Sequence, residues 1–287
     1  WLIAAGGKRI RPLLTLACTQ LYGGSMNRAH GLAASVEFIH TATLLHDDVV
    51  DKSEERRGKN SANVVFGNQA SVLVGDFLFS RAFQLMVADG SIEVLRILSD
   101  ASAVISEGEV MQLQTANDIA TTMEQYNAVI GAKTAALFAA ACEIGPVIAG
   151  ADREAQASMR AYGHNLGMAF QVADDILDYS ADQAVLGKTV GDDFREGKMT
   201  APVIIALSRA TGDEKEFWIR TLEKKAQTPD DLPHAQEIFR RTDALERGME
   251  MAYEYARKAQ AALNAKKGDA LGTALYDLAD FAVGRSY

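Results

Sequence analysis

Apolar residues recur at steps of three and four along almost the whole chain, and this period limits what the chain can fold into. The clearest run ends on an aspartate cluster and comprises Met159, Tyr162, Leu166, Phe170, Ala173 and Leu177. Such spacing places apolar side chains on one face of an α-helix. Alternation with period two is nearly absent. The chain is therefore expected to be all-α, a bundle of roughly ten or more helices around a deep central cavity.

Helix boundaries follow from the same pattern and from local breakers. Pro12 suits a first helical turn, and Gly145-Pro146 is expected to end a helix. Five prolines and no obvious linker favour a single domain over residues 1–287. Besides the helix through 159–177, the expected helices run near Pro12–Tyr22, Arg28–Asp51, Ala70–Ala88, Ser91–Thr115, Met123–Ile130, Lys133–Ile144, Ala201–Arg209, Glu214–Lys225, Asp243–Asn264 and Ala270–Val283.

Two aspartate clusters of the pattern DDxxD, at 47–51 and 174–178, lie inside apolar helical segments. Their first and last carboxylates are four residues apart and project from one helix face. Carboxylates packed among Val, Ile and Leu repel one another and lose hydration unless a cation lies there. A single cluster is as readily a solvated helix end, but two copies near basic segments favour a metal site. Magnesium fits, because proteins hold it by one or two carboxylates plus substrate phosphates.

Two further polar residues share the helix faces of these clusters. A lone histidine is more often an ordinary core or surface residue, but alignment with an aspartate cluster favours a functional role. A polar face inside an apolar helix needs partners. The aligned sets are His40, Asp47 and Asp51 on the first helix, and Gln171, Asp174 and Asp178 on the second.

Positive charge gathers at three places in an otherwise acidic chain. The segment 6–12, Gly-Gly-Lys-Arg-Ile-Arg-Pro, puts three cations before a helix N-terminus, where the helix dipole also attracts anions. Arg56-Arg57-Gly58-Lys59 follows the first cluster, and Lys188 and Lys198 flank the loop after the second. A solvated charge run is the usual meaning of such groups. Beside the carboxylates, they predict phosphate recognised both directly and through magnesium.

Composition excludes several classes of function. The 29 Lys and Arg against 38 Asp and Glu give a net charge of −9, which argues against a general nucleic-acid binder. Cys18 and Cys142 form no framework and are expected to be small core residues in a reducing compartment. We expect no membrane-spanning segment and no signal peptide. Because Trp1 is followed at once by motif-like sequence, an N-terminal segment is expected to be missing.

The absence of a nucleophilic triad, a zinc spacing, a Walker loop and a dinucleotide fingerprint narrows the chemistry further. The remaining candidate is a metal-assisted reaction of diphosphate substrates in an apolar cavity. The expected step is charge separation, with magnesium stabilising a departing diphosphate.

An ordered set of motifs resembles the trans-isoprenyl diphosphate synthases, the polyprenyl synthetase family, over essentially the whole chain. One DDxxD is weak, but the set is highly specific. Within the family the chain looks most like octaprenyl and decaprenyl diphosphate synthases. The motifs are Gly-Gly-Lys-Arg-Ile-Arg-Pro at 6–12, Phe-Ile-His-Thr-Ala-Thr-Leu-Leu-His-Asp-Asp-Val-Val-Asp at 38–51, Arg-Arg-Gly-Lys at 56–59, Gly-Asp-Phe-Leu at 75–78, Lys-Thr at 133–134, Gly-Met-Ala-Phe-Gln-Val-Ala-Asp-Asp-Ile-Leu-Asp-Tyr at 167–179 and Gly-Lys-Thr-Val-Gly-Asp-Asp at 187–193.

The resemblance implies a magnesium-dependent prenyltransferase that lengthens an allylic diphosphate, such as farnesyl diphosphate, with isopentenyl diphosphate. About three magnesium ions would be held by carboxylates and diphosphate oxygens. The implied metal ligands are Asp47, Asp51, Asp174 and Asp178. The implied isopentenyl diphosphate ligands are Lys8, Arg11, His40 and Arg57. The residues implied to hold or polarise the allylic diphosphate are Arg56, Lys133, Thr134, Gln171 and Lys188, with Lys198 close by. The resemblance further implies a homodimer, and the family usually carries one more N-terminal helix.

The residues beside the first cluster bear on product length. Where short-chain members of the family often place an aromatic floor, this chain has Ala42 and Thr43. Small side chains there leave the cavity open beneath a growing chain, which predicts a product of about forty to fifty carbons for quinone side chains. A deeper floor would come from Phe79, Phe83 or Met86, although ordinary core packing is their default reading.

Three alternatives stay open. A geranylgeranyl or hexaprenyl diphosphate synthase would differ only in product length. A terpene cyclase needs no isopentenyl site, so segment 6–12, His40 and Arg57 argue against it. A non-catalytic subunit of a heteromeric synthase typically loses an aspartate cluster, whereas both are complete here. The protein is expected in the cytoplasm, in peripheral contact with a membrane.

Overall fold

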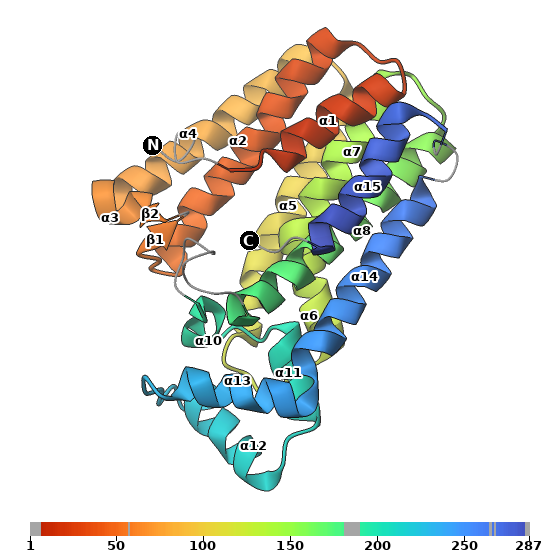
Figure 1. Cartoon of the computed structure of the whole chain (residues 1–287). Coiled ribbons are helices and arrows are strands. Elements are labelled where there is room, and N and C mark those ends of the chain that lie inside the picture. Colours follow the sequence, from red (N-terminus) through yellow and green to blue (C-terminus); the bar gives the residue numbers. More distant parts are fainter. Residues whose placement is uncertain (1–6, 57, 181–189, 264–265, 267, 285–287) are drawn as a thin grey trace. The chain divides into compact units, whose positions relative to one another are not determined.

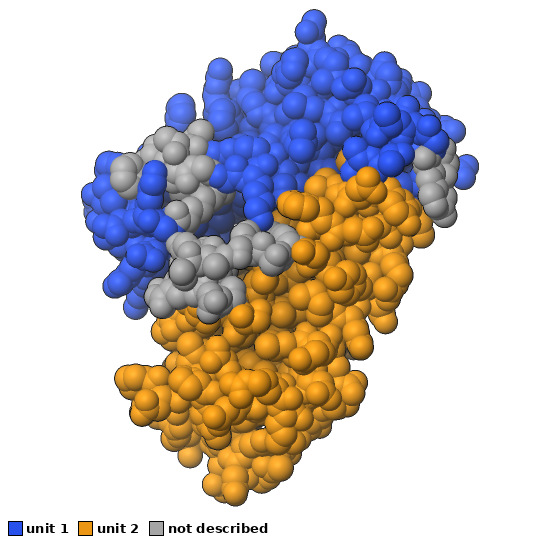
Figure 2. Space-filling view, in the orientation of Figure 1, with its two compact units in different colours: residues 1–103, 136–164, 262–274 blue, residues 104–135, 165–261, 275–287 orange. Residues whose placement is uncertain are grey.

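The computed structural model describes residues 7–56, 58–180, 190–263, 266 and 268–284, and most of them are helical (Figure 1). Within those ranges the strands are limited to a hairpin of β1 (Glu55–Arg56) and β2 (Lys59–Asn60). The all-α prediction is confirmed. The chain divides into two compact units, coloured separately in Figure 2. Unit 1 comprises Trp1–Ala103, Ala136–His164 and Ala262–Ala274, and unit 2 comprises Val104–Ala135, Asn165–Ala261 and Leu275–Tyr287. The single domain over 1–287 stays a prediction.

Unit 1 is organised around one long helix, α2. This helix packs along α4 and against α1, and α1 packs in turn on α7 (Figure 1). The apolar positions Leu32, Val36 and Ile39 of α2 are fully buried, as the spacing predicts. The helices that lie wholly or partly in unit 1 are α1 (Ile10–Leu21), α2 (Met26–Val50), α3 (Ala62–Phe66), α4 (Asn68–Asp89), α5 (Ile92–Thr115), α7 (Ala136–Ile148), α8 (Arg153–Ser180), α14 (Ala244–Ala262) and α15 (Ala270–Gly284).

The prediction that Gly145-Pro146 ends a helix is wrong, because α7 continues through Pro146 to Ile148. A proline so close to a helix end removes only one backbone hydrogen bond. Gly145 serves packing instead. A Cβ atom at this position would lie 2.6 Å from the carbonyl carbon of Cys18 and 2.6 Å from the backbone nitrogen of Thr19. The missing side chain therefore lets the backbones of α1 and α7 approach closely inside unit 1.

Unit 2 combines the remaining parts of the long helices with several short ones. Helix α11 packs against α12 and α13 near an aromatic cluster, in which the rings of Tyr179 and Phe239 meet edge to face at 4.9 Å. Helix α13 was not predicted from the sequence. The further elements of unit 2 are α6 (Met123–Ile130), the π-helical turn η1 (Gly131–Ala135), α10 (Asp192–Glu196), α11 (Ala201–Ser208), α12 (Gly212–Trp218), the π-helical turn η2 (Ile219–Glu223) and α13 (Asp231–Thr242).

Two helices in the described part of the chain, Asn68–Asp89 and Met123–Ile148, are long and apolar enough to cross a membrane by length and composition. This match concerns length and composition alone, so the expected absence of a membrane-spanning segment stays a prediction. Core helices of soluble proteins pass the same test, and 72% of the apolar window in Met123–Ile148 is buried. The corresponding share for Asn68–Asp89, which is α4, is only 22%. Five large apolar side chains of α4 are exposed, namely Val72, Leu73, Val74, Phe77 and Val87.

Candidate active site

The first aspartate cluster, at the end of α2, divides into one buried and two partly exposed carboxylates. Asp48 is fully buried, and Oδ1 of its side chain accepts hydrogen bonds from Nε and Nη2 of Arg56 at 2.9 and 2.5 Å. Burial raises the pKa of Asp48, although the charge of Arg56 opposes this effect. Asp47 and Asp51 remain partly exposed, one helical turn apart. The two residues predicted to bind metal are therefore the two that the fold leaves accessible.

Arg56 connects this cluster to the hairpin. Its side chain is 30% exposed, so pairing with Asp48 orients the guanidinium without burying it completely. A diphosphate role for Arg56 stays a prediction. Two other residues predicted to bind diphosphate, Arg57 and Lys188, lie outside the described residues.

The predicted ligands of isopentenyl diphosphate meet on α1 and α2 within unit 1. Nη1 of Arg11 lies 3.1 Å from Nε2 of His40, and the Arg11 guanidinium stacks over the ring of Phe138 at 4.4 Å. Lys8 is exposed just before α1 begins. The structure thus brings together Arg11 and His40, which are 29 residues apart in the sequence.

The residues predicted to set product length lie between α2 and α4. Ala42 is fully buried in a cluster with Leu45, Ala62 and Leu78, and Phe79 packs against that cluster. The rings of Phe79 and Phe83 are 5.7 Å apart. Thr43 is half-buried and Met86 is fully buried. Ala42 and Phe79, predicted separately, therefore belong to one packing cluster.

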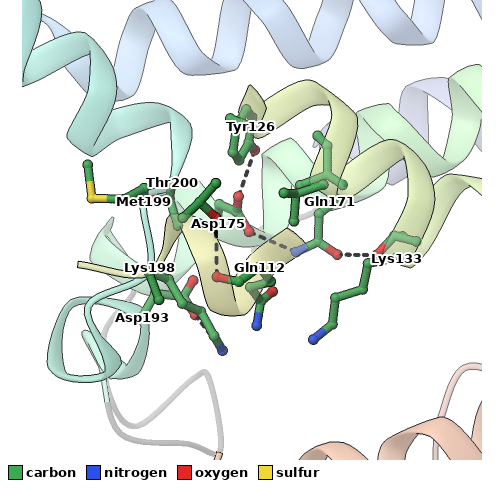
Figure 3. A pocket seen from close by; sticks show the side chains of 14 residues that line it. Gln112, Tyr126, Lys133, Gln171, Asp175, Asp193, Lys198, Met199 and Thr200 are labelled. Atoms are coloured by element: carbon green, nitrogen blue, oxygen red, sulfur yellow. Dashed lines mark hydrogen bonds and ion pairs between the residues drawn. The ribbon is translucent and has the colours of Figure 1, made fainter. Parts of the chain in front are cut away.

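A second group of predicted residues surrounds a small cavity of about 100 Å³ inside unit 2 (Figure 3). Lys133, Thr134, Gln171 and Lys198 line it together, as predicted for an allylic diphosphate site. The remaining lining residues are Gln112, Thr115, Ala116, Tyr126, Val129, Ile130, Asp175, Asp193, Met199 and Thr200.

Lys133 and Thr134 stand on the π-helical turn η1, between α6 and α7. Such turns occur frequently at functional sites. Gly108 of α5 lies against this turn, and a Cβ atom there would be 2.8 Å from the backbone nitrogen of Lys133. The next residue, Glu109, pairs with Nζ of Lys133 at 2.7 Å. Helix α5 thereby holds both the backbone and the ammonium group of Lys133.

A buried chain of hydrogen bonds runs along one side of the cavity. Thr134 donates to Oε1 of Gln171 at 2.8 Å, and Nε2 of Gln171 donates to Oδ1 of Asp175 at 2.7 Å. The hydroxyl of Tyr126 donates to Oδ2 of Asp175 at 2.6 Å. Burial, and then the charge of Asp193, raise the pKa of Asp175, while the bonds from Tyr126 and Gln171 act to lower it.

The second aspartate cluster, on α8, has one partly exposed and two buried carboxylates, whereas the first has two partly exposed and one buried. Asp174 is partly exposed, Asp175 is committed to Tyr126 and Gln171, and Asp178 is fully buried. Oδ2 of Asp178 accepts the backbone N–H of Asp193 at 3.0 Å, which ties α8 to the start of α10. Lys198 pairs with Glu196 at 2.5 Å and lies 3.4 Å from Asp193.

The accessible carboxylates of each unit, taken separately, are of the kind that holds magnesium together with substrate phosphates. Among the residues that the structure describes, no group of three or more His, Cys, Asp or Glu side chains forms a ready-made metal site. Accessible carboxylates in ones and twos, completed by phosphate oxygens, are the usual way in which proteins hold this ion. Asp47, Asp51 and Asp174 offer such carboxylates.

The sequence did not reveal two residues of the cavity region, Tyr126 and Glu109, or the structural role of Asp175. Asp175 belongs to the second aspartate cluster, but helical spacing placed Gln171 on one face with Asp174 and Asp178. Tyr126 contacts Asp175, 49 residues away, and Glu109 contacts Lys133, 24 residues away. Local sequence spacing does not predict contacts over such separations.

Comparisons with known proteins agree on one family. The family model described as Polyprenyl synthetase matches residues 1–239. The octaprenyl diphosphate synthase of Escherichia coli (strain K12) is 46% identical over 285 residues, covering 99% of this chain and 88% of that protein. A solved polyprenyl synthase from Caulobacter crescentus CB15, complexed with calcium and isoprenyl diphosphate, is 51% identical with a TM-score of 0.96, covering 99% of this chain and 87% of that one. A decaprenyl diphosphate synthase from Rhodobacter capsulatus is 50% identical with a TM-score of 0.94, covering 100% and 88%.

Proposed function

The chain belongs to the polyprenyl synthetase family and is a prenyltransferase that makes long-chain all-trans polyprenyl diphosphates, and on this premise we propose how its residues act. The observation that carries the proposal is the cavity in unit 2. There a lysine, a threonine and a glutamine predicted to contact an allylic diphosphate lie beside the second aspartate cluster.

The proposed reaction begins when the bond between allylic carbon and diphosphate oxygen breaks, with both electrons leaving on oxygen. The double bond of isopentenyl diphosphate attacks the allylic carbon, and loss of a proton to the released diphosphate restores a double bond. The product is one isoprene unit longer and can react again. Magnesium, when bound, supplies positive charge that stabilises the leaving diphosphate.

The chain's own residues divide this work. Asp47 and Asp51 in unit 1, and Asp174 in unit 2, are the proposed metal ligands, with Asp178 as a predicted fourth. Arg11 and His40 hold isopentenyl diphosphate. Lys133, fixed by Glu109, neutralises the leaving diphosphate. Thr134 and Gln171 line the cavity, and their oxygens are the proposed stabilisers of the positive charge that develops on the allylic carbon.

The direct test supplies purified protein with magnesium, isopentenyl diphosphate and farnesyl diphosphate, and separates the dephosphorylated products by chain length. We expect products of about forty to fifty carbons, because small residues beside the first cluster leave room for growth. If geranylgeranyl or hexaprenyl products accumulated instead, the enzyme would be reassigned as a synthase of that shorter product. Diphosphate binding without turnover would replace this function with that of a non-catalytic subunit.

Replacing Ala42 with Phe is expected to shorten the product. The new ring would fill space beside Leu45 and Leu78, where Phe79 already packs, and would close the path beneath a growing chain. Chromatography of the products measures the shift. Ala33→Phe is the matched control, because it inserts the same ring at another buried position of α2. If Ala42→Phe gave the same product profile as wild type, the role of Ala42 in setting product length would be refuted.

We further propose that the enzyme works in the cytoplasm at a membrane surface and supplies a quinone side chain. The chemistry of the product supports this, since a diphosphate headgroup on a long apolar chain partitions to a bilayer surface.

The exposed apolar face of α4 supports a homodimer. Leu73, Phe77 and Val87 are 67%, 66% and 63% exposed along this helix, and monomers rarely leave such large apolar patches uncovered. A second copy of the chain is the proposed occupant. Sedimentation velocity should show a dimer for the wild type and a monomer for Leu73→Glu/Phe77→Glu. If the Leu73→Glu/Phe77→Glu variant were still a dimer, the interface would not lie on this face of α4.

A further inference from the structure

Three hydrogen bonds connect Tyr126 to Thr134 through Asp175 and Gln171, and each bond has a defined donor and acceptor. The Tyr126 hydroxyl donates to Oδ2 of Asp175, and the amide N–H of Gln171 donates to Oδ1 of the same side chain. The amide nitrogen of Gln171 is thereby turned toward Asp175, and its oxygen toward Thr134. The Thr134 hydroxyl donates its hydrogen bond to that oxygen. Figure 3 shows Tyr126, Asp175 and Gln171 following one another beside Lys133.

We propose that Tyr126 is a positioning residue for prenyl transfer, which acts through Asp175 to keep the Gln171 amide oxygen on the Thr134 side of the cavity. This inference rests on the proposed function. Tyr126 itself has no part in binding diphosphate or metal, and its effect reaches the substrate only through two other side chains.

The orientation matters because the two ends of an amide carry opposite partial charges. With the observed orientation, Gln171, which lines the cavity, keeps its amide oxygen next to Thr134 and its amide nitrogen toward Asp175. Fixed dipoles aimed at a developing charge lower the barrier without reorganising during the reaction. A flipped amide would present N–H groups there and oppose the positive charge that forms on the allylic carbon.

Local structure holds Tyr126 firmly in place. It lies one turn into α6, whose start is fixed by a capping box between Thr122 and Gln125. Its ring is 3% exposed, and the hydroxyl contact to Asp175 at 2.6 Å lies in the interior. Asp175 is 4% exposed, so water offers little replacement for the lost donor. Removing the single hydroxyl of Tyr126 therefore weakens the hold on Asp175 while the ring keeps its packing.

The experiment compares wild type, Tyr126→Phe, Gln171→Ala and the double variant. Tyr126→Phe should lower kcat about tenfold, since it disturbs a pre-set dipole indirectly, and should leave KM for both substrates within about twofold. In the Gln171→Ala background, Tyr126→Phe should cause no further loss, because both changes act on the same element. Tyr162→Phe, also fully buried but in unit 1, is the control and should keep wild-type kcat.

Two measurements without turnover separate positioning from folding. Calorimetric binding of farnesyl diphosphate with magnesium should be unchanged in Tyr126→Phe, and its thermal unfolding should match that of Tyr162→Phe. An unchanged kcat, an additive double variant, or a loss explained by weaker binding would each overturn the positioning role. Wild-type protein that made no polyprenyl diphosphate would instead overturn the proposed function.

Discussion

Asp47→Ala is expected to lower the rate of prenyl transfer by about a thousandfold or more, as for loss of a group that fixes charge stabilisation at the reacting centre. The fold should be unaffected, because Asp47 is partly exposed at the last turn of α2, whereas the neighbouring Asp48 carries the buried contact to Arg56. Incorporation of labelled isopentenyl diphosphate measures the rate, and the magnesium dependence should shift to higher concentration.

The control for this variant is Asp100→Ala, which removes an exposed carboxylate elsewhere in unit 1. It should keep wild-type rates and an unchanged magnesium dependence. If Asp47→Ala retained a tenth of the wild-type rate, the metal assignment of the first cluster would be wrong.

Gly145→Ala is expected to destabilise the protein by about 3 kcal/mol, the upper part of the usual range for overpacking a core. The added methyl group would overlap the backbone of α1 at Cys18, and backbone atoms cannot rotate away as side chains can. Urea unfolding gives the free energy directly. The outcome is informative because alanine has the higher helix propensity and would otherwise favour the variant.

Gly31→Ala is the matched control for that substitution. Gly31 also lies inside a helix of unit 1, but nothing lies within 4 Å of a Cβ atom placed on it. The same change there should stabilise the protein by about 0.5–1 kcal/mol. Equal effects at both positions would show that α1 and α7 do not depend on the close approach at Gly145.

Helices rich in apolar residues were predicted well from the sequence, whereas α13, which is mostly polar, was not. The helix Met123–Ile130 was predicted with the bounds it has. Helix α13 was missed because much of its sequence is polar, although Ala235, Ile238 and Phe239 are buried at helical spacing. The end predicted at Gly145-Pro146 failed because a residue pair that breaks an isolated helix here serves a contact with α1.

The site was predictable where its residues belong to local motifs. Spacing alone gathered Asp47 with Asp51, and His40 with the same helix face. Spacing could not decide whether Gln171 faces Asp174 or Asp175, because residues three and four apart are both neighbours on a helix. Tyr126 decides it, from 49 residues away, by donating to Asp175. Contacts of that kind depend on tertiary packing, which no local pattern encodes.

The π-helical turn at Gly131–Ala135 makes the length of this segment as important as its composition. Each residue added to or removed from an α-helix rotates everything beyond it by about 100°. Loss of one codon within 131–135 is expected to restore a regular α-helix and to turn Lys133 and Thr134 away from Glu109 and Gln171. Descendants of this sequence can therefore exchange residues of the turn other than Lys133 and Thr134, whereas a single-codon deletion there would leave a helix with these two side chains misplaced.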